Sequence, residues 1–112
     1  MKSNMEKVYN KLVRDNIPNI IKAKGEEPII KVLDDETYKK ELEKKLCEEY
    51  EEVLEASGEE RVEELADMLE IIRSLAKLEN KNLDDVIECA NIKAEKRGAF
   101  EKKIFLEKVI VK

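Results

Sequence analysis

The sequence predicts a single all-α domain, and three observations lead to this fold class. Glycine and proline are rare, with three and two copies in 112 residues, so few positions interrupt a helix. Charged residues make up 44% of the chain and mix with apolar residues at helical spacing over three long stretches. Residues that commonly begin or end helices bound each stretch. The length fits one domain, residues 1–112, without a linker or an internal repeat.

A short helix is predicted first. Asn16 and Pro18 favour a helix start, because Asn caps the first turn and Pro fits within it, and Gly25 favours its end. The β-branched run at residues 29–33 follows Pro28 and predicts a short extended segment. The C-terminal run at residues 104–111 has the same character, which makes it a candidate for pairing with residues 29–33.

Three long helices are predicted between these extended segments, over residues 35–57, 59–80 and 82–97. The first begins after an aspartate at 34 or 35 and is broken by Gly58. Acidic residues after Asn82 favour a helix N-terminus there, and Gly98 ends the last helix.

The apolar faces of the two central helices are wide. At about 100° per residue, helix 35–57 carries one apolar arc, and helix 59–80 carries two adjacent stripes. The arc contains Leu42, Leu46, Tyr50, Val53 and Leu54; the stripes contain Val62, Leu65, Ala66, Leu69, Ile72 and Ala76, and Met68, Ile71, Leu75 and Leu78. One partner helix in a small monomer does not cover so wide a face. We therefore expect a helical bundle completed by oligomerisation, as a homodimer or homotetramer.

Composition excludes several function classes. The chain has no histidine, which rules out Ser-His-Asp triads, Cys-His dyads and imidazole zinc ligands. Its net charge of −5 argues against general binding to nucleic acid or to anionic membranes.

Cys47 and Cys89 form no redox or disulfide pattern and are expected in the core. Without a signal-like or membrane-spanning run, we expect a cytoplasmic protein.

Some carboxylates fall on the apolar faces. Glu49 lies inside the arc of helix 35–57, with Glu52 at its edge, and Glu64 lies in the second stripe of helix 59–80, flanked by Asp67. A carboxylate on a buried face must be paired, protonated or bound to a metal. Charge runs are usually solvated helix surface, and that interpretation remains open from the pattern alone.

The spacing of these carboxylates predicts that they meet. In an antiparallel hairpin, residues equidistant from the turn face each other, and both 49/67 and 52/64 are centred on Gly58. Four carboxylates would then share one small volume between helices about 8–10 Å apart. Their mutual repulsion favours a divalent cation. Oxygen ligands alone favour Mg²⁺, Mn²⁺ or Ca²⁺, and Mg²⁺ commonly takes substrate phosphates as further ligands.

These motifs resemble the all-α NTP pyrophosphatases, which include MazG-like proteins, dimeric dUTPases and phosphoribosyl-ATP pyrophosphohydrolases. The resemblance rests on ExxE at Glu49–Glu52 followed by ExxD at Glu64–Asp67. The segments Tyr9–Pro18 (YNKLVRDNIP) and Lys96–Phe100 (KRGAF) resemble a subgroup of predicted house-cleaning pyrophosphatases. The resemblance implies a MazG-like fold and hydrolysis of a nucleoside triphosphate between its α- and β-phosphates, giving a monophosphate and pyrophosphate.

Residue roles follow from the resemblance by position. Glu49, Glu52, Glu64 and Asp67 are the implied ligands of Mg²⁺, or of Mn²⁺. Glu48 precedes the ExxE motif as an acid does in many members, so Glu48 and Glu49 are the catalytic candidates. Cations are needed for the triphosphate. The substrate-binding candidates are Lys11 and Arg14 in the N-terminal segment, and Asn91, Lys93, Lys96 and Arg97 in the last helix.

Two other functions remain compatible with the sequence. One is hydrolysis of phosphoribosyl-ATP itself. The other is a non-catalytic helical assembly module, in which Glu49 and Glu64 pair with Lys or Arg across an interface. No residue of the sequence identifies a preferred base or sugar.

Overall fold

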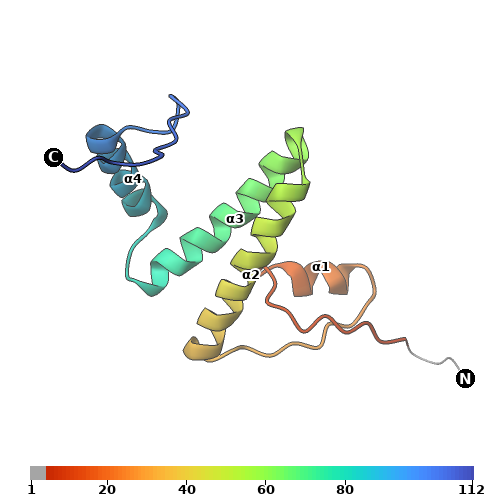
Figure 1. Cartoon of the computed structure of the whole chain (residues 1–112). Helices are drawn as coiled ribbons and strands as arrows, with labels where there is room; N and C mark the ends of the chain where they lie inside the picture. The colour runs from red at the N-terminus through yellow and green to blue at the C-terminus, as the bar shows by residue number, and fades with distance from the viewer. Residues whose placement is uncertain (1–4) are drawn as a thin grey trace, which may run out of the picture.

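Four α-helices form the regular structure of residues 5–112, the part of the chain that the computed structural model describes. They are α1 (Ile17–Ala23), α2 (Asp35–Glu55), α3 (Gly58–Leu78) and α4 (Leu83–Arg97), as Figure 1 shows. No strand occurs within this range, which confirms the all-α fold class. None of the helices found there is long and apolar enough to cross a membrane. Residues 1–4 of the predicted domain lie outside the described range.

The helices begin close to the predicted residues. The Asp34 carboxylate accepts a hydrogen bond of 2.7 Å from the Thr37 backbone N–H and caps α2. Asn82 and Asp85 form a reciprocal capping box at the start of α4, with both hydrogen bonds at 2.9 Å. Asn16 occupies the predicted position before α1, but its side chain makes no capping hydrogen bond.

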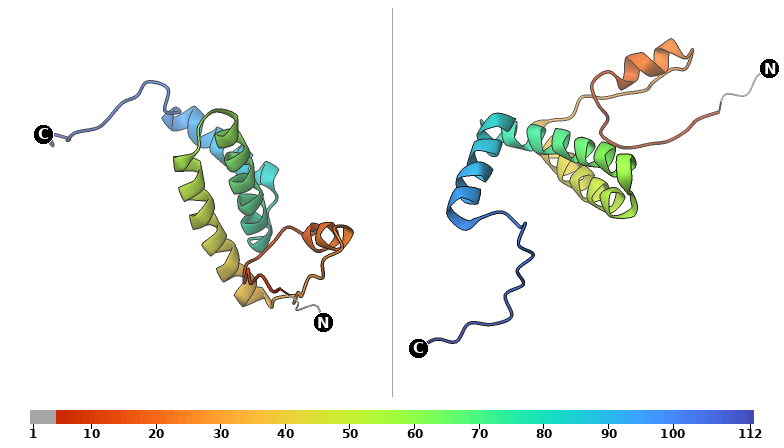
Figure 2. Two further views of the ribbon diagram at one scale, coloured as in Figure 1. Left: turned by 90° about the vertical axis from the view of Figure 1, so that its right-hand side faces the viewer. Right: turned by 90° about the horizontal axis from the view of Figure 1, so that it is seen from above.

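The helices α2 and α3 pack against each other as an antiparallel hairpin (Figure 2). The turn between them consists of Ala56 and Ser57, and Gly58 opens α3 with a φ of +59°. Glycine adopts this left-handed conformation without a steric penalty. The hairpin contains the core of the chain, in which Leu42, Val53, Ile71 and Ala76 are the buried apolar side chains.

The other helices add little packing to the hairpin. The helix α4 contacts only α3, and α1 makes no close backbone contact with any other helix. The chain is consequently elongated, with extents of 81 × 33 × 24 Å and a radius of gyration of 19.8 Å. A compact chain of this length has a radius of gyration of about 13 Å. Its accessible surface of 10937 Å² likewise exceeds the roughly 6,300 Å² of a compact monomer of the same mass.

Several side chains predicted to be in the core are exposed in this chain. Cys47 and Cys89 are both exposed, contrary to the prediction. Tyr50 and Leu54, at the edge of the α2 apolar arc, are 56% and 58% exposed. Each of these side chains lies on a helix with one neighbouring helix, since α2 contacts α3 and α4 contacts α3, so part of each helix surface stays uncovered.

The two extended segments do not pair. Residues 29–33 and 104–111 have no strand hydrogen bonding. They lie at opposite ends of the molecule, beside α1 and beyond α4 respectively (Figures 1 and 2). A β-branched run favours extended backbone but becomes a strand only next to a partner, and α4 carries the C-terminal segment away from the only candidate in the chain.

Candidate metal centre

Three carboxylates from the two central helices meet in the middle of the hairpin. Glu49 projects from α2, and Glu64 and Asp67 project from α3. One carboxylate oxygen from each lies within 4.8 Å of the others. Residues three apart on a helix lie on the same side, and the turn at Gly58 sets Glu49 opposite the pair on α3.

Glu49 is the buried member of the cluster. It is 8% exposed, and it is the one buried polar side chain among residues 5–112. Its Oε2 atom is buried without a hydrogen-bond partner, and so is Oε2 of Glu64. A buried, unpartnered carboxylate oxygen is costly unless it is protonated or coordinates a cation.

The environment of Glu49 favours its neutral form. Burial raises the pKa of Glu49 from 4.5 to about 7, and the nearby carboxyls of Glu52, Glu64 and Asp67 add to the shift. The pKa of Glu64 is also raised, first by the nearby Glu52 carboxyl and then by burial. Near pH 7, Glu49 is therefore protonated for about half of the time when no cation compensates the charge of the cluster.

Glu52 and Glu48 lie outside the three-residue group. The Glu52 carboxyl is nevertheless close enough to Glu49 and Glu64 to raise the pKa of both. The Glu48 side chain is exposed and makes no hydrogen bond or ion pair in the described part of the chain. The structure thus brings three of the four predicted ligands together, with Glu52 exposed beside them, and Glu48 is exposed outside the group.

Arg14 reaches the cluster from the N-terminal segment. Its Nη2 atom donates a hydrogen bond of 2.7 Å to Oδ1 of Asp67, in an ion pair between half-exposed side chains. The sequence predicted Arg14 as a phosphate ligand, and no local pattern linked it to a carboxylate 53 residues away. Lys11 lies nearby in sequence, with its ammonium 5.4 Å from the Tyr9 ring centroid.

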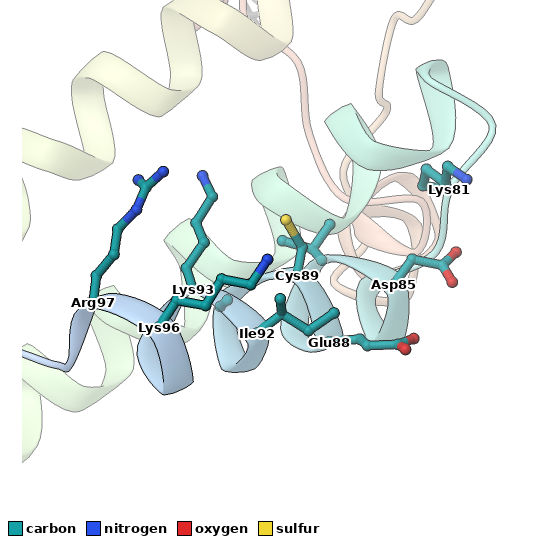
Figure 3. Close-up of a pocket in the computed structure, with 10 residues that line it drawn as sticks. Lys81, Asp85, Glu88, Cys89, Ile92, Lys93, Lys96 and Arg97 are labelled. Carbon is teal, nitrogen blue, oxygen red and sulfur yellow. The ribbon is translucent and has the colours of Figure 1, made fainter.

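The candidate residues of α4 are not part of this cluster within one chain. Asn91, Lys93, Lys96 and Arg97 are all exposed, and α4 makes no close backbone contact with α2. Lys93, Lys96 and Arg97 line an open hollow of about 860 Å³ along α4, together with Lys81, Asp85 and Cys89. Lys93 and Arg97 extend to the same side of the helix, whereas Lys96 leaves it in another direction (Figure 3).

The donor set suits a hard divalent cation. Glu49, Glu64 and Asp67 supply oxygen atoms only, and two of these carboxylates have buried oxygens with no partner. Mg²⁺ and Mn²⁺ favour such ligands, whereas zinc sites usually contain sulfur or imidazole nitrogen. The residues present therefore fit the type of ion that the sequence predicted.

Comparison of the chain with protein-family models, with curated proteins and with solved structures found no significant match. The resemblance to all-α NTP pyrophosphatases therefore rests on the motifs of the sequence.

Proposed function

We propose that this chain is a Mg²⁺-dependent pyrophosphohydrolase that cleaves nucleoside triphosphates between the α- and β-phosphates, releasing a nucleoside monophosphate and pyrophosphate. We also propose that it acts in the cytoplasm and removes noncanonical or excess nucleotides, as expected for the subgroup of house-cleaning pyrophosphatases that its motifs resemble. The observation that carries the proposal is the cluster of Glu49, Glu64 and Asp67, because Glu49 and Glu64 each have a buried oxygen without a partner, which a bound cation would satisfy.

In this proposal Glu49, Glu64 and Asp67 hold Mg²⁺, with Glu52 as the fourth carboxylate beside them. Bound Mg²⁺ neutralises phosphate charge and activates water. An oxygen of Glu49 that does not coordinate Mg²⁺ would be placed to accept the proton of the attacking water. Glu48, the other catalytic candidate, is on the same helix but is exposed outside the cluster, so it would act only through a change of side-chain position.

Cations of the chain bind the phosphates. Arg14 already lies at the cluster, and Lys11 is in the same segment. Lys93, Lys96 and Arg97, with Asn91, are farther along the chain on α4. Since α4 does not contact α2, these side chains reach a triphosphate at the cluster only if α4 moves or a neighbouring subunit supplies them.

We also propose that the chain works as a homodimer or homotetramer. Support comes from the outer face of α3, where Val62, Leu65 and Leu69 are 64%, 47% and 43% exposed. These side chains line an apolar hollow of about 450 Å³ with Ala66, Met68 and Ile72. Neighbouring exposed apolar side chains on one helix face are a candidate protein interface.

The decisive experiment measures monophosphate and pyrophosphate after incubation with Mg²⁺ and a panel of canonical and noncanonical nucleoside triphosphates, with phosphoribosyl-ATP as a further substrate. We expect Glu49→Gln and Asp67→Asn to lose activity by at least about 100-fold. The matched control is Glu51→Gln, which neutralises an exposed carboxylate on the same helix and should keep the activity.

The outcomes separate the alternatives. Activity on phosphoribosyl-ATP alone would select that substrate over the nucleotides. No pyrophosphate from any substrate, with wild type and Glu49→Gln indistinguishable, would refute the enzyme and favour a helical assembly module.

A further inference from the structure

The Arg14–Asp67 ion pair joins the N-terminal part of the chain to the α2–α3 hairpin. We define the N-terminal arm as residues 5–24, which includes α1. No side chain of the arm is buried, and α1 makes no close backbone contact with α2, α3 or α4. In the described part of the chain, the Arg14–Asp67 pair is the one side-chain hydrogen bond between the arm and the hairpin.

Arg14 is also coupled to α1 through its backbone. Its carbonyl oxygen accepts a hydrogen bond of 3.1 Å from the backbone N–H of Ile17, the first residue of α1. The side chain of Arg14 therefore contacts α3 while its main chain contacts the start of α1. Movement of the Arg14 guanidinium away from Asp67 would remove the polar attachment of the whole arm.

The attachment point on the hairpin is one of the candidate metal ligands. Asp67 belongs to the group of three mutually close carboxylates, and Arg14 is the one cation that forms an ion pair with this group in residues 5–112. Arg14 thus partly neutralises the charge that a divalent cation would neutralise more fully.

We propose that Arg14 is a metal-sensitive latch: it holds the N-terminal arm on Asp67 while the carboxylate cluster lacks a metal, and metal binding releases the arm. This inference rests on the metal site of the proposed function. The side chains of Arg14 and Asp67 are 55% and 44% exposed. Pairs this exposed contribute little free energy, so a doubly charged ion among the three carboxylates displaces the guanidinium.

Release has a consequence for substrate binding. The Arg14 guanidinium carries five N–H donors and lies on a segment beside the cluster. Once it no longer pairs with Asp67, it can bind the phosphates of a nucleotide. Metal binding would therefore precede and prepare phosphate binding by the arm, and the nucleotide would order the arm again in a new position.

The test is backbone ¹⁵N relaxation with Mg²⁺ alone as the ligand. In the absence of metal, we expect Arg14→Gln to lower the heteronuclear NOE of residues 9–24 relative to wild type. The control Arg73→Gln removes another arginine–carboxylate pair of α3, with Glu70, and should leave the arm unchanged. Saturating Mg²⁺ should lower the heteronuclear NOE of the wild-type arm to the value of the Arg14→Gln arm. In Arg14→Gln itself, Mg²⁺ should leave the NOE of the arm unchanged.

Isothermal titration provides a second measurement. Removing a competing cation should make Arg14→Gln bind Mg²⁺ about fivefold more tightly than wild type, with Arg73→Gln close to wild type. The latch is refuted if Arg14→Gln leaves the metal-free arm unchanged, or if Mg²⁺ shifts α2 and α3 resonances without loosening the wild-type arm. Absence of any Mg²⁺ binding would refute the latch and the metal site together. A working latch without pyrophosphate release would refute the proposed function alone.

Discussion

Glu49 is a carboxyl group at a position where the helix pattern calls for an apolar side chain. It lies one turn before Val53, a core residue, and both are buried. Neighbouring carboxyls on both helices surround it, so its charge is unfavourable without a cation. The residue is thus a source of instability in the metal-free chain, and this instability is measurable as a dependence on pH.

We predict that the metal-free protein loses stability as the pH rises from about 4.5 to about 7. Folding raises the pKa of Glu49 from 4.5 to about 7, so the folded chain binds more protons than the unfolded chain in this window. The free energy of unfolding therefore falls with increasing pH. At pH 8, Glu49→Gln should raise the free energy of unfolding, measured by urea denaturation, by about 1–2 kcal/mol. Glu48→Gln, an exposed neighbour, is the control, and an identical pH profile for wild type and Glu49→Gln would contradict the prediction.

Metal affinity should show the opposite dependence on pH. A carboxylic acid must lose its proton before it coordinates a cation. Because the pKa of Glu49 is about 7, we predict that the protein binds Mg²⁺ about tenfold more tightly at pH 8 than at pH 6. Titration calorimetry at the two pH values, with Glu49→Gln as the reference that lacks this proton, measures the effect. Equal wild-type affinities at pH 6 and pH 8 would contradict the prediction that Glu49 loses a proton when the metal binds.

At the scale of elements, the α2–α3 hairpin determines which carboxylates meet. Gly58 fixes the turn in a left-handed conformation, and its position sets Glu49 across from the pair on α3. We predict that Gly58→Ala lowers the free energy of unfolding by about 1 kcal/mol. A Cβ at this position meets no atom within 4 Å, so the cost arises from backbone conformation alone.

Urea denaturation measures this cost, and Ser57→Ala is the control. Ser57 precedes α3 at the capping position but makes no capping hydrogen bond, so its substitution should change stability by less than about 0.5 kcal/mol. A larger loss for Ser57→Ala than for Gly58→Ala would mean that the turn is held by the serine instead.

The sequence predicted the elements well because their limits are local. Prolines, glycines and capping residues act within one helical turn, so the bounds of all four helices fall within a few residues of those expected. The meeting of Glu49 with Asp67 was also predictable, because one turn position fixes the register of a hairpin. The Arg14–Asp67 pair was not, since it joins segments 53 residues apart without any shared periodicity.

At the scale of the whole molecule, the sequence identified apolar residues but not which of them would find neighbours. Cys47, Cys89, Tyr50 and Leu54 lie among apolar residues, yet all are exposed in the single chain. A helical wheel gives the direction of a side chain, whereas burial depends on what lies in that direction. An accessible surface of 10937 Å², well above that of a compact monomer, shows how much of the chain lacks such neighbours.

We therefore predict a dimer or a larger assembly at micromolar concentration, detectable by light scattering or sedimentation. Leu69→Glu places a charge on the exposed apolar face of α3, where an interface would desolvate it, and should reduce the mass toward that of one chain of 13.0 kDa. Glu60→Lys changes an exposed charge on the opposite side of α3 and should leave the mass unchanged. A wild-type mass of one chain at micromolar concentration would contradict the prediction. If Leu69→Glu and Glu60→Lys both assemble as wild type does, the interface lies on another surface of the chain.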